Sequence, residues 1–231
     1  MIEINSTEFS GAYDIIEAIR IKKLLKENVS IDTIMRAIEI LKESKELDKE
    51  TFRITVEYSK RLIELYHRSD RKEDYEQELI SYIFGYTQNN LEYIYKLKQE
   101  IDEKEWQTYQ EKIMKEKSCM GIRYEFLEKE EMYEKLLEEV LKEAYIGTLD
   151  RYEKVLKKKF PIQMRDKYIS YVKEYAEHAS DRNAYRNIMT YLKKIKSYPE
   201  GVEVTNKISA EWRVRYKRRR AMMEELKIAG F

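Results

Sequence analysis

The 231-residue chain contains one cysteine, two prolines, six glycines and two histidines. The single cysteine, Cys119, excludes an intrachain disulfide, and the scarcity of proline and glycine beside 39% charged residues is typical of helical proteins. No run approaches the about 20 apolar residues of a membrane-spanning helix, and the N-terminus lacks a signal-peptide pattern. These absences predict a soluble protein of the reducing cytoplasm, without a membrane partner.

Residues typical of catalytic, metal-binding and phosphate-binding sites are also sparse. His67 and His178 lie far apart in the sequence, and Cys119 has no Cys or His at zinc-finger spacing. Neither phosphate-binding glycine motif, GxxxxGK[ST] or GxGxxG, occurs. Clustered carboxylates such as Glu138 and Glu139 alternate with lysines at helical spacing, which is typical of a solvated helix face. We therefore predict a non-enzymatic protein with no catalytic residue, metal, cofactor or small-molecule substrate.

Apolar residues recur at steps of three and four along nearly the whole chain, which indicates amphipathic helices. The pattern predicts about a dozen helices joined by short connections, beginning with one around residues 15–25. Four features mark expected helix ends: Gly147 terminating one helix, Pro161 opening another, Ser180 capping a third, and a turn at residues 199–201.

This pattern predicts an all-α fold in a single domain, residues 1–231, with a softer division near residue 100. A dozen helices around one core form a less common arrangement than a stacked array of helix pairs. No strict period is present, such as the about 34 residues of a tetratricopeptide unit. We therefore expect irregular, tetratricopeptide-like helical repeats that form an α-α superhelix, or solenoid.

The net charge of +1 conceals an uneven distribution along the chain. Residues 1–149 hold 24 basic and 33 acidic side chains, a net charge of −9. Residues 150–231 hold 21 basic and 11 acidic side chains, a net charge of +10. Such an asymmetry can orient a protein toward an acidic partner or a nucleic acid, and it equally fits an internal match between the two halves.

The excess of positive charge is densest near the C-terminus. The candidate contact residues for a nucleic acid or an acidic partner are Lys193, Lys194, Arg213, Arg215, Lys217, Arg218, Arg219 and Arg220. If they neutralise phosphates, binding will weaken steeply with salt through counterion release. In the alternative interpretation they cover the outer face of a terminal helix, where some pair with Glu224 and Glu225.

The chain is rich in tyrosine, with twenty residues. Tyr168, Tyr171 and Tyr175 follow a helical rhythm, so we predict that they pack in the core, although tyrosines can also stack on single-stranded nucleic acid. Arg182 and Tyr185 lie one helical turn apart and are assigned to packing between helices. The two tryptophans, Trp106 and Trp212, are counted with them as structural residues.

Several segments of the last two thirds carry a family resemblance. They are Trp106–Tyr109, Phe126–Glu130, Ser180–Tyr185 (SDRNAY), Tyr191–Lys194 (YLKK) and Tyr216–Ala221 (YKRRRA). Together they resemble the helical region downstream of the zinc finger in bacterial SWIM zinc-finger proteins, over about residues 95–231. The finger itself needs a Cys-x-Cys pair and a later Cys-x-His, and this chain has neither. The resemblance implies a tetratricopeptide-like scaffold and a DNA-associated protein partner, such as an SNF2-type helicase.

The sequence therefore leads to two functional hypotheses. The first is a non-enzymatic helical-repeat scaffold that mediates protein–protein interaction through its groove. The alternative is an accessory module that contacts DNA or RNA through the basic C-terminal helices.

Overall fold

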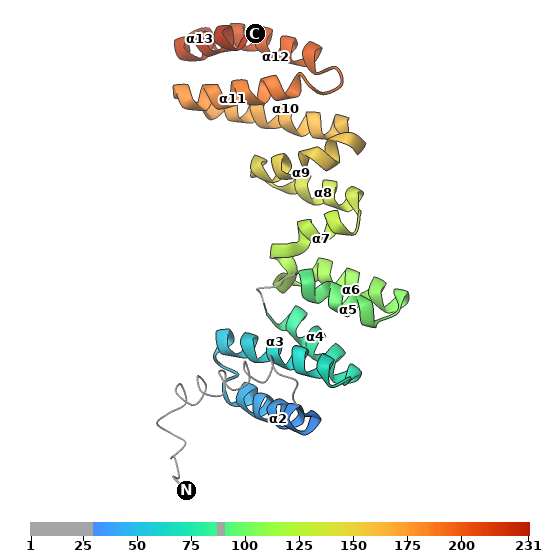
Figure 1. Ribbon diagram of the computed structural model, residues 1–231. Coiled ribbons are helices and arrows are strands. Elements are labelled where there is room, and N and C mark those ends of the chain that lie inside the picture. Colours follow the sequence, from blue (N-terminus) through green and yellow to red (C-terminus); the bar gives the residue numbers. More distant parts are fainter. Residues whose placement is uncertain (1–29, 87–90) are drawn as a thin grey trace. The chain divides into compact units, whose positions relative to one another are not determined.

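The computed structural model describes residues 30–86 and 91–231, and these residues form an all-α fold (Figure 1). They contain twelve α-helices, one 3-10 helix and no strand, which confirms the all-α class predicted from the sequence. The helix expected around residues 15–25 lies outside the described residues. The described residues divide into two compact units at residues 126 and 127, here called the N-terminal and C-terminal units.

The N-terminal unit holds the first helices of the described chain. These are α2 (Ile31–Leu47), α3 (Phe52–Arg68), α4 (Lys72–Gly85), α5 (Leu91–Glu100), α6 (Glu103–Lys115) and the 3-10 helix η1 (Lys117–Ile122), with α7 (Arg123–Lys129) at the boundary. Side-chain caps start two of them: Ser30 accepts from the amide of Thr33, and Asp102 forms a reciprocal capping box with Glu105. Helix α2 packs on α3, α3 on α4 and α4 on α5, and η1 packs against α4 and α6.

The C-terminal unit continues the same neighbour-to-neighbour packing. Its helices are α8 (Tyr133–Lys142), α9 (Ile146–Lys159), α10 (Pro161–His178), α11 (Arg182–Ile195), α12 (Gly201–Arg215) and α13 (Arg220–Ala229). Pro161 occupies the first turn of α10, as predicted. Helices α9, α10 and α11 pack in succession, and α11 also contacts α12 and α13. No helix in either described range is long and apolar enough to cross a membrane.

Two of the predicted helix ends were wrong by a few residues. Helix α8 already ends at Lys142, and Gly147 lies in the first turn of α9 instead of terminating α8. A Cβ at Gly147 would lie 2.4 Å from the ring of Tyr145, so the glycine leaves room for that ring. The cap of α11 is Asp181, not Ser180, because the Asp181 carboxylate accepts from the amide of Ala184 at 2.9 Å.

The connection between α11 and α12 is a tight turn that contacts α10. Glu200 takes a left-handed conformation (φ 57°), and the chain then passes so close to the end of α11 that a Cβ at Gly201 would lie 1.9 Å from the carbonyl oxygen of Ile195. The buried Arg165 of α10 donates to the carbonyl of Pro199 at 2.8 Å and pairs with Glu200 at 2.9 Å. The turn predicted at residues 199–201 is present, and Arg165 binds it through Pro199 and Glu200.

Candidate functional site

Half of the predicted basic run between residues 213 and 220 is engaged inside the C-terminal unit. Arg213 donates to the backbone carbonyl of Phe231, and Arg215 pairs with Glu177 at 3.0 Å. The guanidinium of Arg219 donates to the carbonyls of Ala176 and Ala179 at 2.6 and 3.2 Å, and to that of Glu177 at 3.1 Å. Arg219 thus satisfies the carbonyls at the end of α10, where the helix dipole favours a cation.

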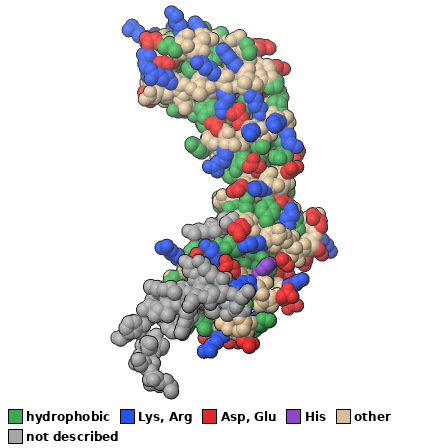
Figure 2. Space-filling view, in the orientation of Figure 1, with side chains coloured by type: hydrophobic (Ala, Val, Ile, Leu, Met, Phe, Trp, Pro, Cys, Tyr) green, Lys and Arg blue, Asp and Glu red, His purple; other side chains and the backbone are tan. Residues whose placement is uncertain are grey.

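The other half of this run faces solvent. Lys217, Arg218 and Arg220 are exposed, as is Lys193, and none has an ion pair or side-chain hydrogen bond within the described ranges. Figure 2 shows Lys and Arg side chains gathered over the end of the unit formed by α12 and α13. We call Lys217, Arg218 and Arg220 the basic end. They remain available to an anionic partner.

The structure assigns Glu224 and Glu225 to partners other than the basic run. Arg182 of α11 pairs with Glu224 at 2.5 Å and with the buried carboxylate of Glu225 at 3.0 Å. Tyr185, 4% exposed, donates its hydroxyl to the carbonyl of Ala179 at 3.1 Å. Both residues lie between helices. The tryptophans are equally buried, at 2% exposure for Trp106 and 1% for Trp212.

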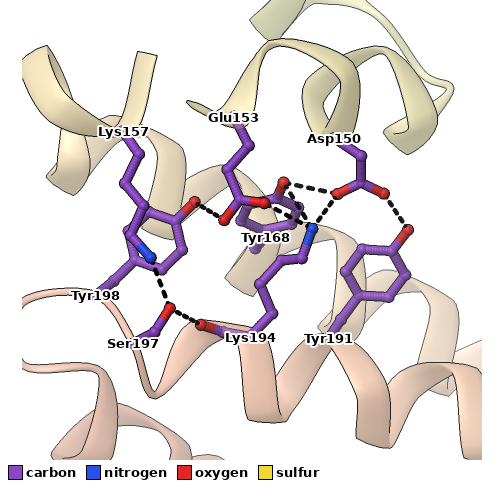
Figure 3. A network of polar contacts seen from close by, with 8 residues as sticks. All are labelled: Asp150, Glu153, Lys157, Tyr168, Tyr191, Lys194, Ser197 and Tyr198. Carbon is purple, nitrogen blue, oxygen red and sulfur yellow. Dashed lines mark hydrogen bonds and ion pairs between the residues drawn. The ribbon is translucent and has the colours of Figure 1, made fainter. Parts of the chain in front are cut away.

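Lys194 was grouped with the basic surface, but its ammonium lies in a network between three helices (Figure 3). The Nζ atom contacts Asp150 Oδ1 at 2.5 Å and Glu153 Oε2 at 2.8 Å, both on α9. Three tyrosine hydroxyls complete the network: those of Tyr168 and Tyr191 donate to Asp150 and that of Tyr198 donates to Glu153, each at 2.7 Å. The side chain of Lys194 is therefore already paired within the fold.

The network keeps its charged groups charged. Burial would raise the pKa of Asp150, but hydrogen bonds from Lys194, Tyr191 and Tyr168 outweigh it and hold this pKa below its ordinary value. Burial alone would lower the pKa of Lys194, but hydrogen bonds to Asp150 and Glu153 outweigh burial and raise this pKa above its ordinary value. The pKa of Tyr168 is strongly raised, by burial first and then by its bond to Asp150, so this hydroxyl stays a donor.

Five tyrosine rings in contact form a ladder along α10 and α11. In order they are Tyr175, Tyr171, Tyr191, Tyr168 and Tyr198, with successive centroid separations of 5.5, 5.0, 5.7 and 5.9 Å. Tyr168 and Tyr198 are buried, whereas Tyr171, Tyr175 and Tyr191 are only half-buried. The ladder therefore has a core end and an end that reaches solvent.

Tyr145, at the start of α9, extends the solvent-facing end. Tyr145 is 74% exposed, and it is the last of the named groups that raise the pKa of Tyr171 and of Tyr191, after burial, Asp150 and a neighbouring tyrosine. We call Tyr145, Tyr171, Tyr175 and Tyr191 the tyrosine surface. It is formed by side chains from three segments of one compact unit.

The sequence analysis assigned Tyr168, Tyr171 and Tyr175 to the core. The structure buries Tyr168 completely but leaves the other two half-exposed. The buried stripe of α10 runs through Met164, Tyr168, Val172 and Ala176, at steps of four residues. Tyr171 and Tyr175 each precede a member of that stripe by one residue, and this offset was the signal available in the sequence.

The N-terminal unit has a surface hollow in which ionisable side chains meet. The hollow, about 450 Å³, is lined by Ile63, Glu64, His67, Arg68, Tyr75, Lys96, Gln99 and Glu100. The ring of His67 packs on that of Tyr75 at 5.2 Å, and Lys96 pairs with Glu92 at 2.7 Å. His67 of α3 is thus packed against α4, and Lys96 is paired within α5. No group of three His, Cys, Asp or Glu side chains in the described ranges could hold a metal ion.

Comparison with protein-family models, with curated proteins and with solved structures finds no match for this chain. The resemblance to the SWIM-associated helical region therefore stays a prediction. The structure defines an all-α protein whose C-terminal unit presents two distinct surfaces, the tyrosine surface and the basic end.

Proposed function

We propose that the protein is a non-enzymatic scaffold that binds another protein, and that the tyrosine surface is the contact. The observation that supports this most directly is the exposure of tyrosine rings on a rigid support. Tyr171 and Tyr191 pack edge to face with ring centroids 5.0 Å apart, and the hydroxyl of Tyr191 is fixed by its hydrogen bond to Asp150. Rings already held in one orientation lose little conformational entropy on binding.

Tyrosine suits protein recognition because one residue offers a large apolar area and a polar hydroxyl, with few rotatable bonds. It is enriched at the residues that dominate binding energy in protein interfaces. The hydroxyl of Tyr171 reaches Asn187 at 3.5 Å, so the surface also carries an amide that can hydrogen-bond a peptide backbone. An open area of this kind fits a polypeptide better than a small molecule, which needs enclosure.

The packing of the helices is compatible with the tetratricopeptide-like arrangement predicted from the sequence. Within each unit, helices contact mainly their neighbours along the chain, as α9, α10 and α11 do. Stacked helix pairs of this type expose long faces to solvent, and repeat proteins bind their partners with such faces. We propose that the chain is an irregular α-α superhelix whose binding face includes the tyrosine surface.

Site-specific photocrosslinking tests this proposal in the cells from which the protein comes. A benzophenone side chain at position 145 should capture one protein, and nuclease treatment of the lysate should leave the adduct unchanged. The same group at Asn206, which is exposed on α12, is the matched control and should capture nothing. Absence of an adduct at position 145, or the same adducts from both positions, would refute the tyrosine surface as the contact.

We also propose a second candidate function, contact with DNA or RNA through the basic end. The observation that favours it is the exposure of Lys217, Arg218 and Arg220 without a partner among the described residues. Arg219 is excluded from this role because it holds the end of α10. The predicted run of six cations thus reduces to three available charges, with Lys193 as a further exposed cation.

Reversing Arg218 and Arg220 to glutamate is expected to abolish any binding of a 20-base-pair DNA or RNA duplex. In the unaltered protein, affinity should fall as salt rises, with a slope of log affinity against log salt of about −2 to −3 if three phosphates are neutralised. Fluorescence anisotropy between 50 and 300 mM salt measures both quantities. Lys207→Glu, on the exposed face of α12, is compared with Arg218→Glu alone, because each single reversal changes the net charge by the same amount. Equal binding by both variants would contradict the nucleic-acid function.

A further inference from the structure

We infer that the tyrosine surface binds a cationic side chain, arginine or lysine, from an extended segment of the protein partner. This inference rests on the proposed function, because it specifies the ligand of the same surface. The first supporting observation is a contact between a cation and tyrosine rings within the protein itself. The ammonium of Lys194 lies 5.0 Å from the ring centroid of Tyr168 and 5.6 Å from that of Tyr191. Both separations are within the about 6 Å over which a cation is attracted to an aromatic face.

Three tyrosine rings of the C-terminal unit outside the tyrosine surface are covered by cations of the chain itself. Lys159 lies over Tyr133 at 4.4 Å, Lys157 over Tyr198 at 4.1 Å and Arg219 over Tyr216 at 4.4 Å. By contrast, within the described residues no Lys or Arg lies over the rings of Tyr145, Tyr171 or Tyr175. These three rings offer the same recognition chemistry to a cation from outside.

Two carboxylates lie beside the tyrosine surface. Asp150 and Glu153 together carry two negative charges, and Lys194 supplies one positive charge in contact with both. These three groups alone sum to −1, and Lys157, which joins the network through Ser197, brings the sum for the whole network to zero. The carboxylate oxygens, and not a net negative charge, are what the network offers to a cation. The side chains of Asp150 and Glu153 are 31% and 22% exposed, so an approaching cation meets these oxygens without full burial.

The Oδ2 atom of Asp150, which accepts a hydrogen bond from Tyr191, can accept one more. The Oδ1 atom of the same carboxylate already accepts from Tyr168 and from Lys194, whereas Oδ2 accepts, among the residues that the structure describes, only from Tyr191. An ionised carboxylate offers about four acceptor positions, two on each oxygen. A guanidinium lying on the rings of Tyr171 and Tyr191 would supply a donor of the required type to Oδ2. A phosphate or a partner carboxylate in the same place would be repelled.

Gly147 determines where the outermost ring lies. A Cβ at position 147 would lie 2.4 to 2.7 Å from three atoms of the Tyr145 ring, so this ring occupies space that a side chain would fill. Because the ring is 74% exposed and belongs to a flexible side chain, an alanine there would displace the ring without opening the core. Gly147→Ala therefore perturbs the tyrosine surface while leaving Tyr145 in the sequence.

The test uses the full chain with ¹³C-labelled tyrosine rings, observed by NMR. The probe is N-acetyl-arginine amide, and its neutral isostere N-acetyl-citrulline amide is the matched control. We expect arginine to produce saturable shifts of Tyr145, Tyr171, Tyr175 and Tyr191, and citrulline to produce at most a third of that effect. Gly147→Ala and Tyr145→Ala should weaken arginine binding about threefold, in keeping with one exposed cation–π contact. Thr190→Ala, exposed on α11, should leave it unchanged.

Several results would overturn the inference: no saturable shift, equal shifts from arginine and citrulline, or stronger shifts from N-acetyl-glutamate amide. Unchanged arginine binding in both Gly147→Ala and Tyr145→Ala would also overturn it. The crosslinking experiment separates this failure from that of the proposed function. A protein captured at position 145 together with no preference for arginine would retain the scaffold and reject the cationic ligand.

Discussion

Replacing Tyr185 with alanine is expected to lower the free energy of unfolding by about 3–5 kcal/mol, the range typical of large aromatic truncations in a core. The ring is 4% exposed and lies on the stripe that α11 buries. Its hydroxyl donates to the carbonyl of Ala179, which also accepts from Arg219. The substitution therefore leaves a cavity and removes one of the side-chain hydrogen bonds accepted by the carbonyl of Ala179.

Chemical denaturation of the full chain measures this loss, and Tyr185→Phe is the matched control. Phenylalanine keeps the ring and removes only the hydroxyl, so we expect a cost of about 1 kcal/mol, the usual value of one neutral hydrogen bond. A loss of partner binding by Tyr185→Ala at an unchanged melting temperature would contradict the structural role. That result would place Tyr185 at a contact surface, not between helices.

Gly201→Ala is expected to destabilise the protein by about 3 kcal/mol, at the upper end of the cost of overpacking. A Cβ at this position would lie 1.9 Å from the carbonyl oxygen of Ile195 and 2.8 Å from its carbonyl carbon. Both atoms belong to the backbone, so no side-chain rotation can relieve the clash. The turn cannot shift freely either, because Arg165 binds Pro199 and Glu200 on its other side.

Differential scanning calorimetry of the full chain provides the measurement. The control is Gly85→Ala at the end of α4, where a Cβ would meet no atom within 4 Å. Because alanine is favoured over glycine in helices by up to about 1 kcal/mol, this variant should be as stable as the unaltered protein or slightly more stable. If both substitutions lowered the melting temperature equally, the close approach at Gly201 would not be the cause.

The fold class was predictable from sequence because apolar periodicity is a local property. The stripes through Tyr185, Ile188 and Leu192, or through Leu136, Leu137 and Val140, predict the faces that the structure buries. Helix ends were less predictable. Gly147 follows an apolar stripe as a terminating glycine would, but its role depends on the ring of Tyr145, a contact that composition does not reveal.

The candidate surfaces were only partly predictable, because charge pattern says nothing about partners distant in sequence. Arg219 and Arg218 are adjacent and chemically identical, yet one satisfies the end of α10 and the other faces solvent. Lys194 belongs by sequence to the basic segments and by structure to a pair of carboxylates more than forty positions upstream. Such pairings are decided by helix packing, which single-sequence patterns do not contain.

The contacts of Lys194 also affect how the C-terminal unit unfolds. Arrays of helices that contact only their neighbours can fray one repeat at a time from an end. Here, moving α9 away from α10 and α11 would break the contacts of the Lys194 ammonium with two carboxylates and remove both tyrosine donors from Asp150. Local opening at this point is therefore costly, and α9, α10 and α11 should exchange their amide hydrogens as one cooperative block.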